Sequence, residues 1–150
     1  MLSYFRFHHV GVATRSIEQT AAIYAGAGYT ASVPVVDPVQ DVRICFLTKE
    51  SMPTVELLEP ADDRSPVNDI LRKNGTAPYH FCYAVPDIEQ AVRELKSQKY
   101  VLIRKPAHAV AFDMLGGGKV CFLYHRQVGL IELLELQEQN ENVCFQEQHH

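Results

Sequence analysis

The chain has 150 residues, of which 47% are hydrophobic, and a formal net charge of -4. It contains no run of about 18 apolar residues that would cross a membrane and no apolar stretch typical of a secretory signal, so we expect a cytoplasmic protein. The acidic balance and the scattered Lys and Arg residues disfavour nucleic-acid binding, and they favour a small-molecule substrate.

The first half of the chain alternates between strand and helix patterns. Period-2 alternation predicts a strand from about Tyr4 to Ala13. A helix follows, with Ser16 as N-cap, Gln19 three residues later as in a capping box, and two glycines as its stop. The remaining pattern predicts three strands, near residues 29–35, 42–47 and 54–58. This half is therefore predicted to be a βαβββ module.

A short connector helix is predicted between the halves, at about residues 65–75, with Ser65 as N-cap, Pro66 at its first position and Gly75 past its end. The second half then repeats the pattern. Asp87 and Gln90 are expected to cap its helix. Its strands are predicted at residues 79–85, 100–104, 119–124 and 130–136, with a glycine-containing loop at 107–118.

The two halves are copies of one another. His9 and His80 are 71 positions apart, whereas Glu56 and Glu132 are 76 positions apart, so the second copy holds about five extra residues. This tandem duplication predicts an α+β fold built from two βαβββ modules. We expect a single domain over residues 1–150, with module one at about 4–60, the connector at about 65–75, module two at about 78–136 and a polar tail at 137–150.

Four repeated residues are the candidate metal ligands: His9, Glu56, His80 and Glu132. A lone His or Glu in a strand is more often structural. A buried carboxylate, however, is costly unless it is paired or bound to a metal, and here two occur with two histidines. Two imidazoles and two carboxylates suit a divalent transition metal and leave two positions of an octahedron open.

Other polar repeats are interpreted as structural. Glu59 and Glu135 are out of phase with the candidate ligands, so they are expected on the opposite face of the sheet. The cysteines have no CxxC spacing, and we expect them to be buried thiols in a reducing compartment; they are Cys45, Cys82, Cys121 and Cys144.

The span from about Phe7 to Leu136 resembles the vicinal oxygen chelate superfamily, which includes glyoxalase I, bleomycin-resistance proteins and extradiol dioxygenases. Within it, the stretch from Val55 to Pro60, the connector helix and His80 look most like the methylmalonyl-CoA epimerases. The resemblance implies an open eight-stranded barrel around one divalent metal ion, Zn, Co, Ni or Mn, and a homodimer. It implies that the metal ligands are His9, Glu56, His80 and Glu132.

The sequence departs from the epimerases in one segment. They usually carry Pro-Glu-x-Gly-Val before the third strand, where this chain has Pro38 to Val42 with Val39 in the position of the acid. The loop from Pro106 to Gly118 also differs, and its His108 is a further candidate for the site. These differences bear on the substrate more than on the metal.

The resemblance implies an isomerase or epimerase that removes a proton next to a carbonyl through a metal-bound enolate, with an acyl-CoA thioester as substrate. Glu132 is the preferred base and Glu56 its partner across the duplication, since both would also be ligands. A glyoxalase I-like lactoylglutathione lyase is an alternative. A second alternative is a non-catalytic binding protein of the bleomycin-resistance type, although the four repeated ligands argue against it.

Overall fold

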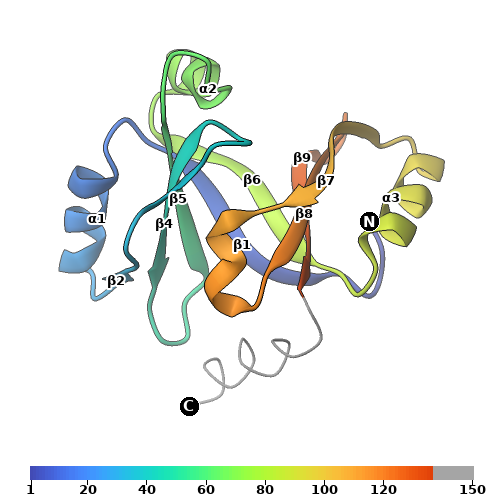
Figure 1. Cartoon of the computed structure of the whole chain (residues 1–150), viewed down its shortest axis with the longest axis horizontal. Helices are drawn as coiled ribbons and strands as arrows, with labels where there is room; N and C mark the ends of the chain where they lie inside the picture. The colour runs from blue at the N-terminus through green and yellow to red at the C-terminus, as the bar shows by residue number, and fades with distance from the viewer. Residues whose placement is uncertain (137–150) are drawn as a thin grey trace. The chain divides into compact units, whose positions relative to one another are not determined.

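The structure, a computed structural model, describes residues 1–136 (Figure 1). The predicted polar tail at 137–150 lies outside these residues. The chain divides into two compact units. The first unit is His9–Tyr79, and the second unit combines Met1–His8 with the chain from His80 onward. Over residues 1–136, no helix is long and apolar enough to cross a membrane.

The first unit holds a small sheet with one helix beside it. Its elements are β1 (Arg6–Ala13, from His9 onward), α1 (Ile17–Gly26), β2 (Thr30–Ala31), β3 (Val35–Asp37), β4 (Val42–Thr48), β5 (Thr54–Pro60) and α2 (Val67–Asn74). Strand β5 pairs parallel with β1 and antiparallel with β4, while β2 and β3 both pair with β4. Helix α1 packs beside β2 and β4 (Figure 1). Its Ile17 joins Leu47 and Leu57 in the buried core.

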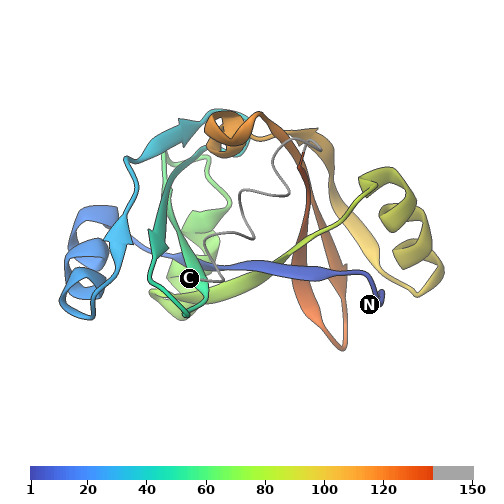
Figure 2. The same ribbon diagram turned by 90° about the horizontal axis from the view of Figure 1, so that it is seen from below.

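The second unit repeats this plan with longer strands. Its elements are β6 (Ala77–Ala84, from His80 onward), α3 (Ile88–Ser97), β7 (Val101–His108), the 3₁₀ helix η1 (Val110–Leu115), β8 (Gly118–His125) and β9 (Gly129–Leu136). Strand β9 pairs parallel with β6 and antiparallel with β8, and β7 pairs antiparallel with β8. Helix α3 lies along β7, β8 and β9 (Figures 1 and 2). It buries Ile88 and Leu95 against Leu123 and Leu133.

Two of the three predicted helix N-caps, Ser16 and Asp87, are confirmed. The Ser16 hydroxyl accepts a hydrogen bond from the backbone N–H of Gln19 at 3.2 Å. The Asp87 carboxylate accepts one from the backbone N–H of Gln90 at 3.0 Å. Each cap satisfies an amide that has no partner within its helix, and therefore fixes where the helix begins.

The main differences from the predicted elements lie in three places. The strand expected at 29–35 is two short strands, β2 and β3, because Pro34 lies between them and cannot donate to a sheet ladder. Strand β7 continues to His108, and the loop expected at 107–118 contains η1. The connector helix starts at Val67, so that Pro66 rather than Ser65 occupies the cap position.

Residues 1–8 pack within the second unit, which the sequence did not predict. The Phe5 ring lies 5.4 Å from the Tyr83 ring, and the Phe7 ring lies 6.0 Å from the Phe81 ring. The Tyr4 hydroxyl donates to the Glu94 carboxylate at 2.9 Å. Burial and this hydrogen bond raise the pKa of Tyr4 to about 12. The start of the chain therefore completes the module that is encoded last.

Candidate metal centre

In the first unit, β1 and β5 bring His9 to Glu56. The parallel register pairs Gly11 with Glu56, so His9 is the diagonal neighbour of Glu56 on the same face. The His9 Nε2 lies 3.3 Å from the Glu56 carboxylate. His9 is fully buried and Glu56 is 2% exposed. Two of the predicted ligands are thus together and screened from water.

The second unit builds the same pair from the same register. Strand β6 pairs Cys82 with Glu132 on β9, which again places the histidine two residues earlier as the diagonal neighbour. The His80 Nε2 lies 3.6 Å from the Glu132 carboxylate, and both residues are buried. The duplication in sequence is therefore also a duplication of local geometry.

An aromatic ring accompanies each pair. Phe46 on β4 lies directly opposite Glu56, and its ring centroid is 5.7 Å from that of His9 at 72°. Phe122 on β8 lies directly opposite Glu132, and its ring centroid is 5.3 Å from that of His80 at 90°. Sequence reasoning missed both rings, although their separation of 76 positions equals that of the glutamates.

The donor chemistry of each pair fits a divalent transition metal. Imidazole nitrogen and carboxylate oxygen bind such ions at about 2.0–2.2 Å, so two adjacent ligand atoms lie about 2.8–3.6 Å apart in octahedral or tetrahedral geometry. The observed separations of 3.3 and 3.6 Å are close to that spacing. Each unit therefore offers two ligands already near the separation that a shared ion requires.

Glu59 and Glu135 each bond to a helix N-terminus, a role that the alternation of the strands did not predict. The Glu59 carboxylate accepts a hydrogen bond from the backbone N–H of Ile17 at 2.7 Å, and the Glu135 carboxylate accepts one from Ile88 at 2.8 Å. Each acid thus ties the first turn of a helix to the last strand of its module. A carboxylate is favourable at a helix N-terminus because of the helix dipole.

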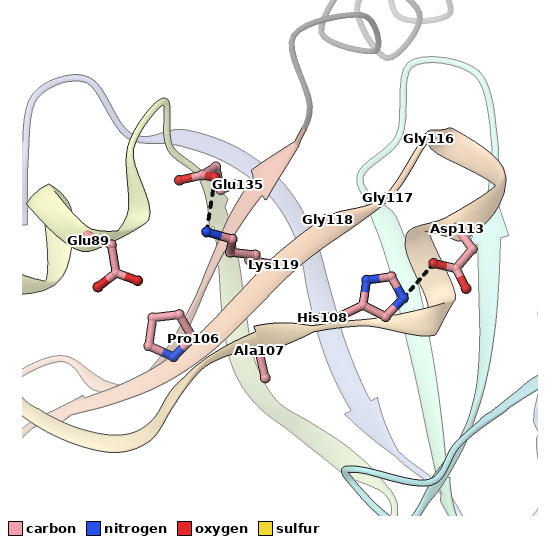
Figure 3. A pocket seen from close by; sticks show the side chains of 10 residues that line it. All are labelled: Glu89, Pro106, Ala107, His108, Asp113, Gly116, Gly117, Gly118, Lys119 and Glu135. Atoms are coloured by element: carbon pink, nitrogen blue, oxygen red, sulfur yellow. Dashed lines mark ion pairs between the residues drawn. The ribbon is translucent and has the colours of Figure 1, made fainter.

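A separate open pocket of about 690 Å³ lies beside the N-terminus of α3 (Figure 3). Its lining includes Glu89, Lys119 and Glu135. The equivalent residues of the first unit are joined by ion pairs, in which Arg43 contacts Glu18 at 2.7 Å and Glu59 at 3.5 Å. Lys119 lies 4.0 Å from Glu135. Its ammonium lacks the planar guanidinium of arginine, which can bond to two carboxylates at once.

His108 also lines this pocket, where its Nε2 is 2.7 Å from Asp113 (Figure 3). The His108 side chain is 60% exposed. Strand alternation places Glu135, in the same pocket, on the face of β9 opposite to Glu132. His108 is therefore held by Asp113 in a pocket formed from the opposite face of β9.

The segment with the unusual Val39 is a tight turn. The buried Asp37 carboxylate accepts hydrogen bonds from the backbone N–H groups of Val39 at 2.9 Å and Gln40 at 3.2 Å. The Val39 side chain is 57% exposed at the tip of this turn. An exposed apolar side chain thus stands where the epimerases were expected to carry an acid.

The cysteines in the described part of the chain are buried thiols, as predicted. They are Cys45, Cys82 and Cys121, while Cys144 lies outside the described residues. Burial, followed by the nearby Glu132 charge, raises the pKa of Cys121 to about 12. We assign these thiols to packing.

Two βαβββ modules, each with a buried His–Glu pair on its first and last strands, define a duplicated α+β protein. The family model of the Glyoxalase/Bleomycin resistance protein/Dioxygenase superfamily matches residues 8–122. The chain belongs to this superfamily. The predicted superfamily membership and the predicted α+β fold class are confirmed.

The named relatives are methylmalonyl-CoA epimerases, and the solved structures share the fold. The chain is 30% identical to the mitochondrial methylmalonyl-CoA epimerase of Dictyostelium discoideum, over 89% of this chain and 78% of that protein. It is 32% identical to the human mitochondrial methylmalonyl-CoA epimerase, over 89% and 73% respectively. A hypothetical protein of Bacillus halodurans superposes with a TM-score of 0.80 at 29% identity, covering 93% of this chain and all of that one. The methylmalonyl-CoA epimerase of Mycobacterium tuberculosis gives 0.78 at 22% identity, covering 93% and 95%.

Proposed function

We propose that this protein is an epimerase that inverts the carbon next to the carbonyl of an acyl-CoA thioester, with methylmalonyl-CoA as the first substrate to test. The observation that carries the proposal is the buried His–Glu pair repeated in both units. The proposal is supported by relatives that are named methylmalonyl-CoA epimerases, and one solved structure of that enzyme holds methylmalonyl-CoA.

We propose further that the two pairs hold one divalent metal ion, Zn, Co, Ni or Mn. One pair alone offers two ligands, and protein sites for such ions use three or four. His9 and Glu56 would supply half of the set, and His80 and Glu132 the other half. When bound, the ion would act as a Lewis acid that draws charge from the substrate carbonyl.

The protein's own groups would move the proton. Glu132 would take the proton from the carbon, and the electron pair of that bond would pass into the carbonyl. Glu56, protonated and released from the ion, would return a proton to the opposite face, which inverts the centre, and Glu132 would then pass its proton to solvent. Because both carboxylates are buried, water competes little for these transfers.

Val39 favours a second candidate function. Its exposed apolar side chain stands where an acid is expected in the epimerases. Loss of that acid matters less to an enzyme that moves a proton between neighbouring carbons than it does to an epimerase. A glyoxalase I-like lactoylglutathione lyase is therefore the alternative. The homodimer and the cytoplasmic location remain predictions, and several relatives are named as mitochondrial.

The test follows exchange of the α-proton of methylmalonyl-CoA by NMR in heavy water, with one equivalent of Co²⁺. We expect metal-dependent loss of the proton signal with the wild-type protein and none with Glu132→Gln. Glu135→Gln is the matched control, because it makes the same change three residues away, on the opposite face of β9. It should retain exchange.

Two outcomes would contradict the proposal. Equal exchange in the Glu132→Gln variant would exclude Glu132 as the base. Absence of exchange in the metal-loaded wild-type protein would exclude the epimerase, and turnover of the hemithioacetal of glutathione and methylglyoxal would then establish the lyase.

A further inference from the structure

The two phenylalanines beside the His–Glu pairs occupy equivalent places in three-strand rows. In the first unit the row is Gly11 on β1, Glu56 on β5 and Phe46 on β4, and His9 is the diagonal neighbour of Glu56, two residues before Gly11. The second unit has the equivalent row on β6, β9 and β8, ending at Phe122. In each unit the phenyl ring packs at a steep angle to the imidazole.

This contact restricts the least constrained side-chain torsion of the histidine. The χ2 torsion of histidine joins an sp³ carbon to an sp² ring, so its energy well is broad and the imidazole plane is poorly fixed by the side chain alone. A metal ion needs the nitrogen lone pair to point at it. An aromatic neighbour at a steep angle narrows the allowed rotation, and such pairs contribute favourable edge-to-face contacts.

We propose that Phe46 and Phe122 are positioning residues that fix the imidazole planes of His9 and His80 for metal binding. This inference rests on the proposed metal centre. Neither phenylalanine needs to touch the substrate or the ion. The rings act through the histidines, in the way that groups behind a ligand tune its orientation.

The two units differ in how firmly the ring is held. Phe122 is 8% exposed, and its ring lies closer to the histidine ring and nearer to perpendicular than that of Phe46. Phe46 is partly exposed. The second unit therefore has the more rigid contact, and removing the Phe122 ring should have the larger effect.

The experiment measures Co²⁺ affinity by competition with a chelating dye and records the visible absorption of bound Co²⁺. Phe122→Leu and Phe46→Leu remove the ring, and Phe46→Tyr keeps it at the partly exposed position. Phe5→Leu is the matched control, since Phe5 packs on Tyr83 rather than on a ligand. Thermal unfolding of each metal-free variant measures the structural cost separately.

We expect Phe122→Leu to weaken Co²⁺ binding by about tenfold or more and to change the absorption bands, as for other groups that orient a ligand. Phe46→Leu should have a smaller effect in the same direction, and Phe46→Tyr should resemble the wild type. Phe5→Leu should lower stability without changing the affinity or the spectrum.

Wild-type affinity and an unchanged spectrum in both leucine variants would overturn the inference while leaving the metal centre intact. If Phe122→Leu does not fold, the two Phe46 variants decide the question. Equal Co²⁺ binding by Phe46→Leu and Phe46→Tyr would overturn the role of the ring. A wild-type protein that binds no Co²⁺ would overturn both this inference and the proposed function.

Discussion

The Glu59 carboxylate accepts a hydrogen bond from the backbone N–H of Ile17, at 2.7 Å, and so joins the last strand of its module to the first turn of α1. Glu135 and Ile88 repeat the contact at 2.8 Å in the second unit. Each of these acids follows a proposed ligand by three residues. One strand thus carries the glutamate of the proposed metal site on one face and a glutamate bonded to the helix on the other.

Replacing Glu135 by Gln should lower stability without affecting metal binding. The amide keeps the shape but loses the charge that favours a helix N-terminus, and we expect a cost of about 1 kcal/mol in the free energy of unfolding. Urea unfolding measures this cost. Glu89→Gln is the control, because it makes the same change at a neighbouring glutamate, whereas the Ile88 amide bonds to Glu135. Equal losses in the two variants would exclude a specific role for the Glu135 contact.

Two Gly→Ala substitutions should change stability in opposite directions. A Cβ at Gly118 would meet Leu134 Cδ1 at 3.1 Å and Phe112 Cβ at 3.3 Å, so overpacking should cost about 1–3 kcal/mol. A Cβ at Gly26, at the end of α1, meets nothing within 4 Å. Gly26→Ala should therefore stabilise by about 0.4–1 kcal/mol. Thermal unfolding of the two variants, which should shift Tm in opposite directions, checks this prediction.

Removal of the metal should lower both activity and thermal stability. A ligand that binds only the folded state stabilises it by about 2.7 kcal/mol at a hundred times its dissociation constant. We therefore expect dialysis against EDTA to lower Tm by several degrees and Co²⁺ to restore it. His80→Asn is the control, and Co²⁺ should leave its Tm unchanged. An equal rise in that variant would place the bound ion elsewhere.

Alkaline pH should destabilise the protein partly through Cys121. The thiol ionises near pH 8.5 in an unfolded chain, whereas burial raises its pKa to about 12 in the folded protein. Between these values only the unfolded state loses the proton. Stability from this group is thus complete below about pH 8.5 and falls by at most about 1.4 kcal/mol per pH unit above it.

Urea unfolding from pH 8 to 11 measures this effect against a Cys121→Ala variant. The wild-type protein should lose stability more steeply over this interval, because the variant has no thiol at that position to ionise. Parallel pH profiles would mean that the Cys121 thiol ionises equally in both states.

Much of the fold follows from local sequence. Ser16 and Asp87 cap the helices that their spacing predicted, because a cap depends on residues only three positions apart. The broken strand around Pro34 was harder to anticipate, since alternation continues through a residue that cannot pair. Within each unit, the predicted His and Glu do come together.

The other contacts of the site depend on the register of the paired strands, which the local sequence does not indicate. Phe46 and Phe122 become neighbours of the histidines only through strand pairing, and apolar aromatic residues in strands are too common to single out. Their shared offset with the glutamates was the available signal. The roles of Glu59 and Glu135 were assigned to the correct face, but not to a helix terminus, because that contact joins residues more than forty positions apart.

The packing of residues 1–8 in the second unit sets an order of events for the growing chain. Tyr4 and Phe5 leave the ribosome long before Glu94 and Tyr83, the residues that they contact. Closing so long a loop is entropically costly and slows folding. The segment from His9 to Tyr79 can form its contacts during synthesis, whereas residues 1–8 can form theirs only after the second unit has been made.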